Sequence, residues 1–145
     1  MTSDASLRIC LFTPTFLPRL GGAEVVVDAL ARQFLAMGHA PHVLTPTSDR
    51  GPCPELPYPV HHYRKPVWQQ WWPERIARPL ERLHKAHRFD VILAFYGQPT
   101  GYAAIVARKR LGAAVVIGCH GGDLYRGGKT RRRPHLWRRV VAAYQ

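Results

Sequence analysis

Apolar residues along this chain follow two different periods. Short continuous apolar runs occupy residues 7–13, 40–45, 89–95 and 113–118, a pattern typical of strands buried on both faces of a parallel sheet. Between the first two runs, apolar residues recur at helical spacing (Ala23, Val26, Val27, Leu30, Ala31 and Phe34). Strands that alternate with helices predict an α/β protein with an open parallel sheet and helices on both faces.

Local signals set the expected limits of the other elements. The first helix is expected over 23–37, with Asp28 and Arg32 paired at i,i+4 and Gly38 at its end. A short strand is expected over 58–63. We expect Pro79 to open the main part of the next helix, which reaches residue 87, because proline suits a first turn but not a helix interior. Further helices are expected over 99–111 and 134–144.

A glycine pair separates the first strand from the first helix. Gly21 and Gly22 let backbone N–H groups approach a ligand, and a helix N-terminus supplies unpaired donors and a partial positive charge. The turn falls at the carboxyl end of the first strand, where ligands bind in open α/β sheets. These residues are consistent with either an anion site or a tight turn without a ligand.

Length and composition indicate one folded domain. The chain has 145 residues and a hydrophobic fraction of 46%, which suits a sizeable core. No apolar run is long enough to span a bilayer and the first residues lack a signal-peptide pattern, so we expect a cytoplasmic protein. Cys10, Cys53 and Cys119 are widely spaced without a CxxC motif, which argues against a disulfide framework or a structural zinc site.

Positive charge gathers toward the end of the chain. The formal net charge is +12, and residues 108–145 contain ten basic residues and one acid. This field favours anionic partners, but no nucleic-acid-binding motif accompanies it, so specific nucleic-acid recognition is not expected. Trp68, Trp71 and Trp72 lie among basic residues that include Arg75. These four side chains suit either packing or contact with a lipid-linked acceptor or the inner face of an anionic membrane.

Four short motifs in a fixed order carry a family resemblance. A strand precedes P-x-x-G-G-x-E and a helix, G-H and D-V each precede a strand, and H-G-G-D-L follows one. This order resembles the N-terminal domain of family 4 glycosyltransferases, which have the GT-B fold. The matching residues are Pro18, Gly21, Gly22, Glu24, Gly38, His39, Asp90, Val91, His120, Gly121, Gly122, Asp123 and Leu124.

The resemblance implies a function for this chain. It implies retaining transfer of a hexosyl unit from a nucleotide-sugar donor to an acceptor in glycan biosynthesis, without a catalytic metal or other cofactor. His120 would be the catalytic residue, in contact with the transferred sugar. The residues that would line the cleft for substrate or diphosphate are Gly21, Gly22, Glu24, Gly121, Gly122 and Asp123.

One departure from the family pattern limits that expectation. The family's donor-binding domain follows this one and carries a basic pair and an E-x7-E motif, and no segment of this sequence matches that domain. We therefore expect residues 1–145 to be a single Rossmann-like acceptor-side domain, shortened at its C-terminal end and inactive without a separate donor domain. A non-catalytic module that binds a phosphorylated or lipid-linked ligand is the alternative.

Overall fold

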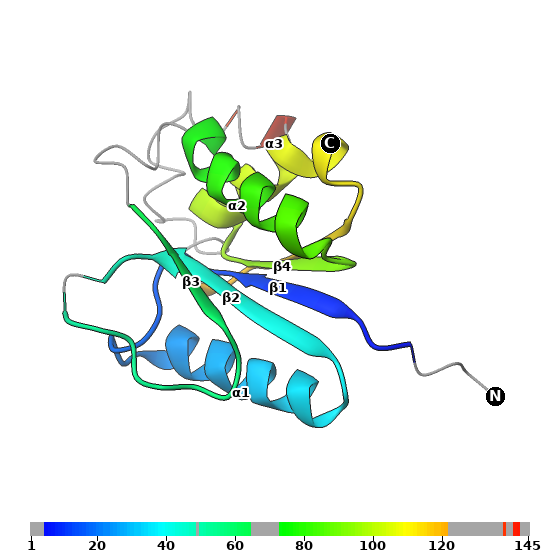
Figure 1. Ribbon diagram of the computed structural model, residues 1–145. Helices are drawn as coiled ribbons and strands as arrows, with labels where there is room; N and C mark the ends of the chain where they lie inside the picture. Colours follow the sequence, from blue (N-terminus) through cyan, green and yellow to red (C-terminus); the bar gives the residue numbers. More distant parts are fainter. Residues whose placement is uncertain (1–4, 49, 65–72, 122–137, 139–140, 143–145) are drawn as a thin grey trace.

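Five parallel strands form one sheet in the order β3-β2-β1-β4-β5 (Figure 1). The computed structural model describes residues 5–48, 50–64, 73–121, 138 and 141–142. The elements along the chain are β1 (Arg8–Phe12), α1 (Gly22–Ala36), β2 (Ala40–Pro46), β3 (Val60–Tyr63), α2 (Pro73–His87), β4 (Val91–Phe95), the short π-helical turn η2 (Gly97–Gly101), α3 (Tyr102–Leu111) and β5 (Ala114–Gly118). The predicted open parallel sheet is confirmed.

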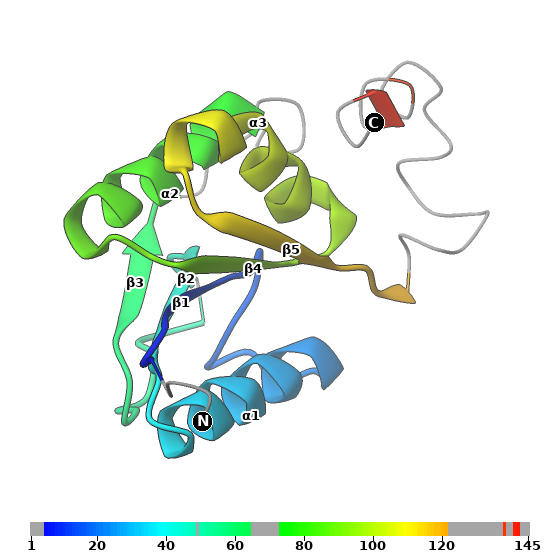
Figure 2. The ribbon, with the colours of Figure 1, turned by 90° about the vertical axis from the view of Figure 1, so that its right-hand side faces the viewer.

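Helices cover both faces of the sheet. Helix α1 lies on one face, and α2 and α3 lie together on the other (Figures 1 and 2). Neighbouring residues of β1 enter opposite cores: Leu11 packs in the cluster that contains Val27 of α1, and Phe12 packs in the cluster that contains Ile76 of α2. Burial on both faces explains why this strand is a continuous apolar run rather than an alternating one.

The apolar stripe of α1 is narrower than expected. Val27 and Ala31 are fully buried, but Val26 is 44% exposed, so its predicted place in the stripe is wrong. Successive helical residues point about 100° apart, and the stripe facing the sheet is centred on Val27 and Ala31. The predicted end is confirmed, because Gly38 adopts a left-handed φ of 84° and its N–H donates to the Leu35 carbonyl at 3.0 Å.

Helix α2 begins earlier than the sequence predicts. Pro79 lies inside the helix rather than at its start. The turn before it holds Ile76 and Ala77, which are both fully buried, as is Leu80 in the following turn. Burial of these side chains against the core offsets the hydrogen bond that proline cannot donate.

The segment expected as one helix over 99–111 is divided. Helix α3 begins at Tyr102, and η2 precedes it with a non-helical residue at Gln98 (φ −147°, ψ 139°). Within η2, the buried Thr100 hydroxyl donates to the carbonyl of Phe95, the last residue of β4. This contact ties the turn to the strand end. The helix expected over 134–144 lies mostly outside the described residues.

An ion pair aligns the starts of the neighbouring strands β1 and β4. Asp90, which precedes β4, accepts from the backbone N–H of Arg8 at 2.8 Å and pairs with the Arg8 guanidinium at 2.9 Å. The guanidinium and this backbone N–H lower the pKa of the Asp90 carboxyl to about 2. The Asp90–Val91 motif therefore has a role in strand alignment.

Candidate functional site

The carboxyl ends of β1 and β4 meet where the chain order of the sheet changes direction. From β1 the chain builds outward through β2 and β3, then returns to add β4 and β5 on the other side. Figure 2 shows the end of β5 and the N-terminal end of α1 on this same side of the molecule. Open α/β sheets bind ligands at such a switch point, so we define these strand ends as the carboxyl edge.

The loop after β1 is held by side-chain hydrogen bonds. The Thr13 hydroxyl donates to the Thr15 carbonyl at 2.8 Å, and the Thr15 hydroxyl donates to Oε1 of Glu24 at 2.8 Å. Glu24 is only 4% exposed, and Arg19 Nε lies 3.8 Å from the same oxygen. Glu24 thus supports the turn from within, and its predicted contact with a ligand stays a prediction.

The two glycines of the turn have different surroundings. A Cβ on Gly21 would lie 2.5 Å from Oε2 of Glu24, whereas a Cβ on Gly22 would meet no atom within 4 Å. Gly21 is extended (φ −162°) and sits at the N-cap of α1, and both glycines are exposed. Gly21 therefore provides space for the folded-back carboxylate, while Gly22 leaves the first turn of α1 open to solvent.

A pocket of about 280 Å³ opens beside this turn. Its walls come from the loops after β1 and β2, and it holds two cations and three hydroxyl groups with no acid among its lining residues (Pro14, Thr15, Phe16, Arg19, Pro46, Thr47, Ser48 and Arg50). Guanidinium and hydroxyl groups are the donors that phosphate and sugar oxygens need. The pocket is therefore suited to a polar or anionic ligand.

His120 follows β5 at the same edge. Its ring stacks on Phe95 of β4, with centroids 5.7 Å apart and planes 7° apart, and meets Tyr96 edge-on at 5.5 Å. A Cβ on Gly118 would lie 3.0 Å from His120 Nε2, so the glycine permits this close approach. The aromatic pair fixes the position of the imidazole over the end of β4.

Backbone strain marks the same place. Tyr96 has a φ of 70°, a left-handed value that side-chain-bearing residues rarely adopt. Its N–H donates to the Gly118 carbonyl at 2.8 Å, and its own carbonyl accepts from Gly101 at 3.0 Å. Strained residues held by surrounding structure concentrate at functional sites, so Tyr96 joins His120 as a candidate.

The structure brings together only some of the predicted site residues. Gly21 and Gly22 lie after β1, and His120 and Gly121 lie after β5, on one edge. Gly122, Asp123, Trp68, Trp71 and Trp72 lie outside the described residues. Sequence reasoning missed Tyr96 and the pocket residues Arg19 and Arg50. A signal existed for Tyr96, because it directly follows an apolar strand, as His120 does.

A second, larger hollow of about 930 Å³ lies between β3 and α2. Four arginines line this basic groove and no acid does (Leu44, Val60, His61, His62, Tyr63, Arg64, Arg75, Arg78, Pro79, Arg82, Leu83 and Ala86). Arg75, one of the predicted acceptor or membrane contacts, is among them. The groove gathers part of the excess positive charge on one side of the sheet.

Among the described residues, one group could hold a metal ion, and it lies away from the carboxyl edge. His42, His61 and His87 place their ligand atoms within 4.8 Å of one another. His42 is near the start of β2 and His87 is the last residue of α2. Sequence reasoning missed this group because the three residues are far apart in the chain.

Solved structures resemble this fold at low sequence identity. The catalytic domain of starch synthase IV from Arabidopsis thaliana matches 82% of the chain with a TM-score of 0.65 and 16% identity. A glycosyltransferase from Rickettsia africae matches 76% with a TM-score of 0.56 and 13% identity. A hydrogenase C-terminal domain from Pyrococcus furiosus matches 78% with a TM-score of 0.51 and 12% identity, and is itself covered over 92% of its length. The shared fold alone therefore does not separate transferases from other proteins.

The sequence, rather than the fold, shows to which family the chain belongs. The chain spans 35% of the starch synthase domain and 29% of the Rickettsia protein. No curated protein matches it. The sequence pattern of Glycosyltransferase Family 4, however, matches residues 20–145, which include the glycine turn, the basic groove and His120. With its Rossmann-like sheet of the GT-B type, the chain belongs to glycosyltransferase family 4.

Proposed function

We propose that this chain is the acceptor-side domain of a retaining glycosyltransferase that moves a hexosyl unit from a nucleotide sugar to an acceptor. The observation that carries the proposal is the common edge: the glycine turn after β1 and His120 after β5 lie at the carboxyl ends of strands joined through β4. This edge is the ligand-binding side of an open α/β sheet.

Roles follow from the chemistry at that edge. When the bond between the sugar and the diphosphate breaks, negative charge grows on the leaving oxygen and positive charge grows at the sugar ring. In this proposal the open first turn of α1 faces the diphosphate. His120 hydrogen-bonds the transferred sugar, and the pocket with Arg19 and Arg50 holds polar groups of the acceptor. The starch synthase that resembles this chain was solved with ADP and acarbose bound; ADP is a nucleoside diphosphate of the kind this scheme releases.

The proposal includes dependence on a donor-binding domain. No catalytic metal is invoked, because helix N-termini and arginines would carry the charge of the leaving group. The test compares this chain alone with the chain co-expressed with the product of the coding region that follows it. We expect release of nucleoside diphosphate from UDP-, GDP- or ADP-sugars only with the second component. Turnover by this chain alone would contradict the proposal, as would a pair that binds no sugar nucleotide.

The basic groove favours a second candidate function. Four arginines around a large hollow would hold the phosphates of a phosphorylated or lipid-linked ligand without chemistry. In either case, we propose a cytoplasmic protein that contacts the inner face of an anionic membrane peripherally. Among the described residues, none of the helices has the length and apolar composition needed to cross a bilayer. Pyrophosphate binding that Arg78→Gln abolishes, with no sugar-nucleotide turnover in any pairing, would favour the binding module.

A further inference from the structure

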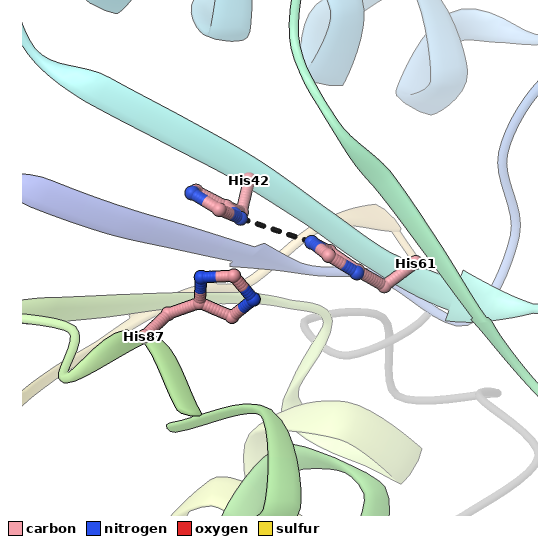
Figure 3. A group of neighbouring side chains, drawn as sticks. All are labelled: His42, His61 and His87. Atoms are coloured by element: carbon pink, nitrogen blue, oxygen red, sulfur yellow. Dashed lines mark hydrogen bonds between the residues drawn. The ribbon is translucent and has the colours of Figure 1, made fainter. Parts of the chain in front are cut away.

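Three histidines from separate elements converge near the amino end of the sheet. His42 comes from β2, His61 from β3, and His87 from the last turn of α2. Figure 3 shows the His87 ring facing the gap between the other two rings. The His42 Nδ1 and His61 Nε2 atoms are 2.9 Å apart, and the ligand atoms of all three rings lie within 4.8 Å of one another.

The spacing is close to that of a metal site. Nitrogen atoms bound to tetrahedral zinc at about 2.0–2.1 Å lie roughly 3.3 Å from each other. To bind one ion, the 2.9 Å pair would need to part by about 0.4 Å and His87 would need to move inward. All three histidines are partly exposed, so an ion can reach the cluster from solvent.

Two of the three rings, His42 and His61, lie in surroundings that disfavour the protonated form. Burial, followed by the neighbouring His87 and His61 rings, lowers the pKa of His42 to about 4. Burial, followed by His87 and His62, also lowers the pKa of His61. A neutral imidazole has a lone pair that it can donate to a metal ion. The one hydrogen bond within the cluster joins His42 and His61 and does not include His87.

We propose that His42, His61 and His87 bind one divalent transition-metal ion, Zn²⁺ in particular, with water in the fourth position. Three imidazoles with an open position form a known zinc ligand set, and imidazole suits zinc among the divalent metals. The ion would join β3, an edge strand paired only with β2 among the described strands, to β2 and to the end of α2. Its role in this proposal is structural and independent of glycosyl transfer.

The test uses the full chain after dialysis against a chelator. Zn²⁺ is titrated in competition with a chromophoric indicator, and melting temperature is followed with and without Zn²⁺. We expect one Zn²⁺ per chain and a higher melting temperature with the metal. The His87→Asn and His61→Asn variants should each bind at least about 100-fold more weakly, since even partners outside the ligand set cost up to that much. The matched control is His62→Asn, an exposed neighbour on β3 outside the cluster, which should bind as the parent does.

A second measurement uses the parent chain, so it does not depend on whether the variants fold. Co²⁺ added to the parent chain should give the intense visible absorption of a tetrahedral site, and equimolar Zn²⁺ should remove it. Weak octahedral absorption, binding unchanged by His87→Asn, or an equal loss in His62→Asn would each overturn the proposal. The three rings would then be a packed aromatic cluster that needs no metal.

Discussion

At the scale of single residues, the glycine pair divides into two roles. Gly21 provides space for the Glu24 carboxylate, and Gly22 has open space around it. Glu24 in turn accepts the Thr15 hydroxyl, so the turn is held from inside by a buried acid rather than by its glycines alone.

Alanine at these two positions should therefore have unequal effects. We expect Gly21→Ala to lower the free energy of unfolding by about 1–2 kcal/mol, because the displaced carboxylate loses its buried hydrogen bond. Gly22→Ala should change it by less than about 0.5 kcal/mol. Urea unfolding measures both. In a Glu24→Ala background the cost of Gly21→Ala should disappear; a cost that persists would show that the carboxylate is not its cause.

His120 is the residue on which glycosyl transfer most depends in our proposal. In the complete enzyme, His120→Ala should lower kcat by about 100-fold or more, the loss typical of a donor aimed at transition-state charge. Its unfolding free energy should fall by only about 1 kcal/mol, from the lost stacking on Phe95. The control is His39→Ala, the same substitution at a residue that follows the C-terminal end of α1. Unchanged turnover in His120→Ala would remove the catalytic assignment.

At the scale of elements, the local sequence signal and the packing favour different starts for α2. The proline favours a start at Pro79, whereas burial of the preceding turn favours the earlier start that the structure shows. If the helix began at Pro79, replacing it with alanine would be close to neutral. Because Pro79 lies inside α2, we expect Pro79→Ala to raise the free energy of unfolding by about 1–3 kcal/mol by restoring a backbone hydrogen bond. Thermal unfolding measures this, with Lys85→Ala on the same helix as the control. A neutral Pro79→Ala would indicate a break in the helix before that residue.

The ion pair between Arg8 and Asp90 gives the molecule a defined response to acid. The pKa of Asp90 is about 2 in the folded chain against 3.8 for an ordinary aspartate. Its stabilising effect is therefore fully present above about pH 4 and is lost as the pH falls toward 2. We expect Asp90→Asn to destabilise the chain at pH 7 and to match the parent near pH 2. A difference that stays constant between pH 7 and pH 2 would contradict the ion pair as its source.

At the scale of the whole molecule, arginines and no acids line both pockets described above. The carboxyl edge carries the candidate site, and the basic groove lies beside it between β3 and α2. A net charge of +12 attracts anions in general, so only placement distinguishes a binding surface from a solvated one.

Vesicle binding tests that placement. Each arginine near an anionic surface contributes about 1 kcal/mol, so Arg78→Gln with Arg82→Gln should weaken binding to phosphatidylserine vesicles by about 30-fold. Arg108→Gln with Lys109→Gln removes the same charge from exposed positions on α3 and should weaken it by less than about threefold. Co-sedimentation in low and high salt measures both. Equal losses in the two variants would mean that net charge, not the groove, binds the membrane.

The sequence by itself determined the fold class, most of the elements and the family, because apolar periodicity and turn residues act over a few positions. It also predicted that Gly21, Gly22 and His120 lie near strand ends. Tertiary structure decided what depends on distant contacts. Packing against the core let α2 continue past Pro79. The position of β4 beside β1 and β5 placed Tyr96 against His120. Folding also brought His42, His61 and His87 together from three elements. Neighbours that are far apart in sequence leave no local pattern, so only the folded chain defines them.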